Sequence, residues 1–143
     1  MMKRFAGLLA LVLALGRLTA GDGLTRRDAV VAMFKSNETQ FLEAARQQDF
    51  KALESIDGVM EVSMDGSCVD IFCGGAGFGP STHYYGIFYS GQDDLCAVSI
   101  ACCGSADQLT ADGAGYRCRQ PDGDNEYYVE SLGHHYYYYE AHY

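Results

Sequence analysis

Apolar and polar residues follow two different periods along the chain, and the change falls near residue 58. In the first part, apolar residues recur three and four positions apart, as in helices that bury one face. These residues are Val30, Val31, Phe34, Phe41, Leu42 and Ala45. A helix start after Ser36 would divide this stripe, so residues 21–58 are predicted to form one amphipathic helix or two.

From residue 59 onward the apolar positions alternate with a period of two, which is typical of strands with one buried face. Asp65-Gly66 indicates a hairpin turn between the first two strands. Further strands are predicted over residues 83–90, 95–103, 114–119, 125–132 and 134–143. Short links join antiparallel neighbours, because parallel strands need long crossovers. The sequence therefore predicts an α+β fold, with the N-terminal helix or helices packed on a curved antiparallel meander of about six or seven strands (residues 59–143).

Residues 1–20 have the layout of a signal peptide. Two basic residues precede an apolar run over residues 5–16, and Arg17 and the small residue Ala20 follow. The run is shorter than the roughly 20 apolar residues of a membrane-spanning helix. We therefore expect a secreted protein with no membrane association after cleavage, in which residues 21–143 form a single domain.

Acidic residues exceed basic residues by 19 to 10. Removal of residues 1–20 takes away three basic residues and no acidic one, which leaves a net charge of −12. After Lys51, only Arg117 and Arg119 oppose fourteen acidic residues. Because such a surface repels phosphate groups, we expect no nucleic-acid partner. The expected partner is an extracellular protein or a glycan.

Six cysteines in an exported chain permit up to three disulfides, in any of fifteen pairings. Cys68 and Cys73 lie five positions apart, so on one regular strand they face opposite sides and should not bond each other. The spacing of the cysteines does not match the close pairs of structural zinc sites. We predict neither a metal site nor a cofactor.

The stretch CGGAGFGPSTHYYG, residues 73–86, is rich in glycine, and we interpret it as a structural loop or a binding rim. It lacks the lysine and the following helix of a phosphate-binding loop. Ser81 and His83 could supply a nucleophile and a base, although no acid is defined that would orient the histidine. A small extracellular hydrolase that uses this loop and His83 is therefore the alternative function.

The chain ends in SLGHHYYYYEAHY, residues 131–143. On a strand, His134, Glu140 and His142 would share one face, but no third metal ligand is identifiable. A strand covered on both faces explains the tyrosines, because each ring is buried while its hydroxyl finds a partner. Tyrosine is also common at recognition surfaces. The candidate ligand-binding residues are Gly75, Gly77, Tyr84, Tyr85, Tyr137 and Tyr139.

Two segments, DIFCGGAGFGPSTHYYGIFYS and GDNEYYVESLGHHYYYYEAHY, resemble those of a family of small exported proteins from Gram-positive, largely anaerobic bacteria. Members share a C-G-G-x-G-x-G-x-S-T-x-Y-Y-G-x-x-Y run and a tyrosine-rich end, and the resemblance covers residues 59–143. It implies export and transfers no catalytic residue. The sequence is thus interpreted as a secreted binding or interaction module without enzymatic activity, with an aromatic, acidic surface.

Overall fold

The computed structural model describes residues 23–78 and 81–143, so the predicted signal peptide lies outside the described residues. Helices α2 (Arg27–Ser36) and α3 (Glu38–Gln47) and the 3-10 helix η1 (Phe50–Ser55) precede a seven-stranded sheet. In residues 23–78 and 81–143, no helix is long and apolar enough to span a membrane.

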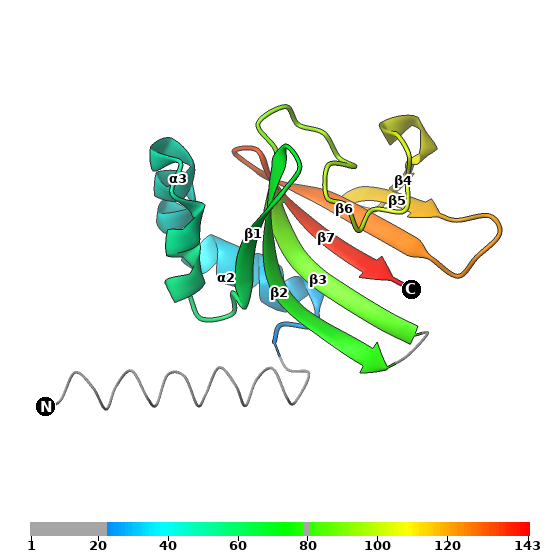
Figure 1. The fold of residues 1–143 in the computed structure, drawn as a ribbon, viewed down its shortest axis with the longest axis horizontal. Coiled ribbons are helices and arrows are strands. Elements are labelled where there is room, and N and C mark those ends of the chain that lie inside the picture. The colour runs from blue at the N-terminus through cyan, green and yellow to red at the C-terminus, as the bar shows by residue number, and fades with distance from the viewer. Residues whose placement is uncertain (1–22, 79–80) are drawn as a thin grey trace, which may run out of the picture.

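The sheet is antiparallel throughout and joins two runs of hairpins (Figure 1). Its strands are β1 (Glu61–Asp65), β2 (Cys68–Phe78), β3 (Ser81–Tyr89), β4 (Thr110–Asp112), β5 (Gly115–Arg119), β6 (Glu126–Gly133) and β7 (Tyr136–His142). Their order is β1-β2-β3-β7-β6-β5-β4, so β3 pairs with β7 rather than with β4. The predicted α+β class, with N-terminal helices on an antiparallel sheet, is confirmed.

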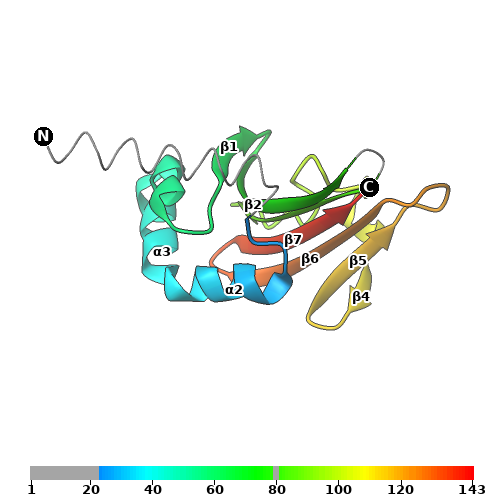
Figure 2. The ribbon, with the colours of Figure 1, turned by 90° about the horizontal axis from the view of Figure 1, so that it is seen from below.

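The helical stripe breaks at Asn37, as the sequence allowed, and gives two helices. Helix α2 lies along one face of the sheet, and α3 turns away from α2 at one end of the sheet (Figure 2). The Asn37 amide side chain donates to the carbonyl of Met33 at 2.8 Å, which closes the end of α2. Phe41 packs edge-on against Tyr136, with ring centroids 5.2 Å apart. The Tyr136 hydroxyl donates to the Phe41 carbonyl at 2.6 Å, so the buried phenol is satisfied.

An ion pair also fixes α2 to the sheet. The Arg27 guanidinium donates two hydrogen bonds, of 2.7 and 2.6 Å, to the two carboxylate oxygens of Glu130 in β6. The Tyr128 hydroxyl adds a third bond to this carboxylate, at 3.0 Å. The guanidinium holds the pKa of Glu130 below its usual range, chiefly through these hydrogen bonds.

The sheet separates two hydrophobic cores. On the helix face, residues such as Ile71, Ile87 and Tyr138 pack with the helices. On the opposite face, which we call the loop face, residues such as Phe88 and Val129 pack under the crossing loop, residues 90–109, which runs from β3 to β4. Along β7, Tyr136 and Tyr138 lie in the first core and Tyr137 and Tyr139 in the second, as the period of two predicts.

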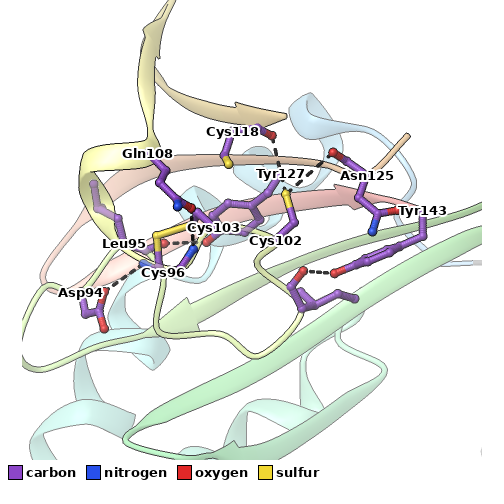
Figure 3. The surroundings of a disulfide bond; sticks show 12 residues. Asp94, Leu95, Cys96, Cys102, Cys103, Gln108, Cys118, Asn125, Tyr127 and Tyr143 are labelled. Atoms are coloured by element: carbon purple, nitrogen blue, oxygen red, sulfur yellow. Dashed lines mark hydrogen bonds between the residues drawn. A yellow bond between two sulfur atoms is a disulfide. The ribbon is translucent and has the colours of Figure 1, made fainter. Parts of the chain in front are cut away.

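The strand predicted over residues 95–103 is wrong. This stretch forms turns within the crossing loop, where the disulfide between Cys96 and Cys103 closes a small ring (Figure 3). Val98, 1% exposed, supplies the apolar anchor that made the run look like a buried strand. The three exposed residues of β4 were not predicted, because they carry no apolar alternation.

The glycine-rich stretch, residues 73–86, was interpreted as a loop or a binding rim, but residues 73–78 are the second half of β2 and residues 81–86 are part of β3. A bulge lies between Phe72 and Gly74. A side chain at Gly74 would meet the backbone of Leu24, because a Cβ there would lie 2.4 Å from the Leu24 carbonyl oxygen. Gly77 has a φ of +101°, which favours glycine. The close approach of the Leu24 backbone therefore explains Gly74, and the backbone conformation explains Gly77.

The last predicted strand begins too early, since residues 134 and 135 form the turn between β6 and β7. Both histidines have positive φ, 56° for His134 and 68° for His135, as in a two-residue hairpin turn that matches the twist of the strands. They therefore do not belong to the two faces of β7.

Candidate functional site

Most of the candidate residues gather at one end of the sheet, which we call the distal end. It comprises residues 72–78 of β2, 81–85 of β3 and 140–143 at the end of β7, and it lies away from α3 (Figure 2). Six candidates lie there: Gly75, Gly77, Ser81, His83, Tyr84 and Tyr85. Strand β7 joins them because His142 stands opposite His83 across the β3–β7 pair, although 59 positions separate the two.

The other two candidates, Tyr137 and Tyr139, lie in the loop-face core. They are 6% and 1% exposed. The Tyr137 hydroxyl donates to Asp93 at 2.6 Å, and the Tyr139 hydroxyl donates to Asp70 at 2.8 Å. Burial raises the pKa of both phenols. Both side chains therefore stabilise the fold. Neither of them is among the aromatic rings at the surface of the distal end.

Two imidazoles meet on the helix face of the distal end, beyond the cover of the helices. Nδ1 of His83 contacts Nδ1 of His142, and the rings lie nearly perpendicular, at 83°. The second nitrogen of His142, Nε2, lies 3.6 Å from a carboxylate oxygen of Glu140. His142 therefore bridges a carboxylate and a second imidazole, an arrangement that orients His83 and can carry a proton.

A belt of charged groups continues from Glu140 across β6 and β5. Arg117 lies 3.9 Å from Glu140, 3.3 Å from Glu126 and 2.7 Å from Asp112. Arg119 forms a further ion pair with Glu126. The hydrogen bond that Arg117 donates to Asp112, foremost, raises the pKa of Arg117. Two guanidinium groups thus face three carboxylates, so the imidazole pair adjoins an acidic belt.

The loop face of the distal end carries an aromatic row of three half-buried rings, Phe72, Tyr84 and Tyr143. The centroids of Phe72 and Tyr84 lie 6.3 Å apart, and those of Tyr84 and Tyr143 lie 6.2 Å apart. Gly75 stands opposite Tyr84 in the register, and a Cβ there would lie 3.3 Å from the Phe72 ring. The row therefore crosses β2, β3 and β7 where glycine leaves room for the Phe72 ring.

The sequence pattern did not point to Phe72 and Arg117 as members of this region. Phe72 looked like an ordinary strand residue, and its contact with Tyr84 depends on the pairing of β2 with β3. The position of Arg117 depends on the pairing of β5 with β6, which the strand pattern alone leaves open. Alternation does assign His142 and Glu140 to one face, but only the β3–β7 pairing brings His83 to them.

Several catalytic arrangements find no support here. In the described chain, no hydrogen bond joins Ser81 to His83, whose ring nitrogen contacts His142 instead. No group of three or more His, Cys, Asp or Glu side chains in residues 23–78 and 81–143 is arranged to hold a metal ion. Two shallow hollows, of about 180 and 320 Å³, are lined by residues 39–69, and neither includes a histidine.

No protein-family model matches the chain, and neither the curated proteins nor the solved structures include a match. The resemblance to exported bacterial proteins therefore stays a prediction. Any assignment of function has to rest on the residues of the site itself.

Proposed function

We propose that this chain is a secreted, non-enzymatic binding module, and that it binds a neutral glycan across the aromatic row of the distal end. The supporting observation is the row itself: Phe72, Tyr84 and Tyr143 lie side by side and stay half-buried, whereas the tyrosines in the middle of β7 are buried. Sugar rings present apolar C–H faces and polar hydroxyl edges. Aromatic rings that carry hydroxyl groups complement both features.

The surface supports a glycan better than a large protein partner. Stable protein interfaces bury about 1,200–2,000 Å² around a hydrophobic centre. In the part of the chain that the structure describes, the large hydrophobic residues that are strongly exposed are Met64 and Tyr116, at 71% and 45%. They lie on β1 and β5, which are separated in the sheet, so they form no such centre. The acidic chain would also repel anionic glycans.

The test is a binding assay of the purified protein with neutral polysaccharides, followed by calorimetry with soluble fragments of those that bind. Loss of one stacked ring should cost about 1–3 kcal/mol, so Tyr84→Ala should weaken binding about 5- to 150-fold. Tyr84→Phe should retain binding, because the ring remains. Tyr116→Ala, which removes a tyrosine outside the row, is the matched control and should bind as the parent does. Equal binding by Tyr84→Ala, with circular dichroism unchanged, would contradict the proposal.

A hydrolase is the second candidate, because the chain from Glu140 through His142 to His83 leaves Nε2 of His83 as an oriented base. Ester, amide and glycoside substrates would be assayed with the parent, His83→Ala and Ser81→Ala. The binding proposal predicts no turnover by the parent. Turnover that disappears in a folded His83→Ala protein would favour the hydrolase instead.

A further inference from the structure

Half of the cysteines lie in the crossing loop, and one of them points away from the disulfide. Cys96 and Cys103 form the disulfide, whereas the neighbouring Cys102 directs its thiol toward the β5–β6 hairpin (Figure 3). The Cys102 sulfur lies 3.8 Å from the carbonyl oxygen of Cys118 and 3.8 Å from that of Asn125. The loop thus touches the sheet through this thiol.

The thiol of Cys118 lies on the same side, within the loop-face core that Cys102 packs against. Burial foremost, together with the charge and hydrogen bonding of the adjacent Cys118 thiol, raises the pKa of Cys102 to about 11. Cys118 is 6% exposed, whereas Cys102 is more accessible.

The remaining two thiols both lie on β2. Cys68 and Cys73 are both 0% exposed and belong to the two different cores, on opposite faces of β2, as predicted from their spacing. Burial raises the pKa of both. Neither is therefore open to a reagent in the folded protein.

We propose that Cys102 and Cys118 are a redox-active dithiol that a small disulfide donor converts into a second disulfide, tying the crossing loop to β5. The thiolate of Cys102 attacks one sulfur of the donor and releases the other sulfur as a thiol, which leaves a mixed disulfide. The thiolate of Cys118 then attacks the Cys102 sulfur and releases the second donor thiol. Two thiols of the protein lose two protons and two electrons, and the donor disulfide gains them.

The different exposure of the two thiols fixes their roles. Cys102 meets the donor, and Cys118, which the donor cannot reach, resolves the mixed disulfide. The bond would hold the loop beside the aromatic row, since the Tyr143 hydroxyl already donates to the carbonyl of Ile100 in the same loop. The inference does not depend on the proposed glycan, because it concerns covalent chemistry alone.

The experiment treats the full purified chain with oxidised glutathione, unfolds and alkylates it, and then measures intact mass and maps the peptides. The untreated protein should carry four alkylated cysteines, and the treated protein two, with one peptide linking Cys102 to Cys118. Cys102→Ser, at the more accessible position, should form no link, whereas Cys73→Ser should form it as the parent does.

Oxidation should also raise the melting temperature of the parent by about 10 °C, since the bond constrains the unfolded chain. The Cys102→Ser protein should show no such rise. Retention of all four thiols, arrest at a glutathione adduct on Cys102, or a link between Cys102 and any other cysteine would each overturn the proposal.

Discussion

Asp70 is the acidic group whose environment gives the sharpest stability prediction. It lies in β2 on the loop face, where the Tyr139 hydroxyl donates to it at 2.8 Å. Burial raises its pKa from 3.8 to about 6, despite the opposing hydrogen bond from Tyr139, and the nearby carboxylates Asp65 and Glu61 add to the rise. The substitution Asp70→Asn removes the charge and keeps an oxygen that accepts from Tyr139.

A pKa raised from 3.8 to about 6 means that the fold favours the protonated acid. The stability that this group contributes is fully present below about pH 4 and is lost as the pH rises through about 6. The full difference corresponds to about 3 kcal/mol, and because Asp70 stays partly exposed we expect about 1–2 kcal/mol. Asp70→Asn should therefore stabilise the protein by that amount near pH 7 and hardly at all near pH 4.

Urea unfolding at several pH values, followed by circular dichroism, measures this difference. The exposed Asp122→Asn is the matched control, because it makes the same change of net charge on this acidic chain. A gain for Asp70→Asn no larger than that of Asp122→Asn, or one that does not change between about pH 4 and 7, would refute the reasoning.

Two further substitutions test the packing, each against a matched control. Arg27→Gln should lower the free energy of unfolding by about 1–2 kcal/mol at neutral pH, because Glu130, which is 8% exposed, would lose its partner. The loss is no larger because Arg27 itself is partly exposed, so water screens the pair. The loss should shrink in acid, since the lowered pKa of Glu130 makes the pair stabilising only while the carboxylate is ionised. Arg46→Gln, in an exposed pair, should have no measurable effect in the same urea titrations. Gly86→Ala should lower the free energy of unfolding by about 2–3 kcal/mol, because the new Cβ would lie 2.8 Å from a carbonyl oxygen of β2. Gly91→Ala, whose Cβ would have no neighbour nearer than 3.9 Å, should leave thermal unfolding unchanged.

Within each strand, side-chain alternation could be predicted from the sequence. Tyr136 and Tyr138 face the helices and Tyr137 and Tyr139 face the crossing loop because the strand period is two whatever the neighbours are. The same rule placed Cys68 and Cys73 on opposite faces. Local geometry suffices for such predictions, since they need no knowledge of which strands pair.

Strand order could not be predicted in this way. Short links suggested that each strand pairs with the next, but the crossing loop carries the chain from β3 to the far edge, and β7 returns to lie beside β3. The loop itself was misread, because Val98 is buried although the apolar run around it does not form a strand. Its turns are closed by the Cys96–Cys103 disulfide, and the pairing of six cysteines cannot be deduced from their spacing.

The position of the candidate site follows from how far the two layers extend over the sheet. On the helix face the cover of β7 ends after Tyr138, and the next residues on that face are Glu140 and His142, which water can reach. On the loop face burial continues to Ala141. Where a strand is covered on both sides, the residues on both of its faces are apolar rings. Where the cover ends, side chains still alternate between the two faces, so polar groups lie on one face and a half-buried ring lies on the other. The end of β7 therefore supplies both the imidazole that meets His83 and the phenol of Tyr143 in the aromatic row.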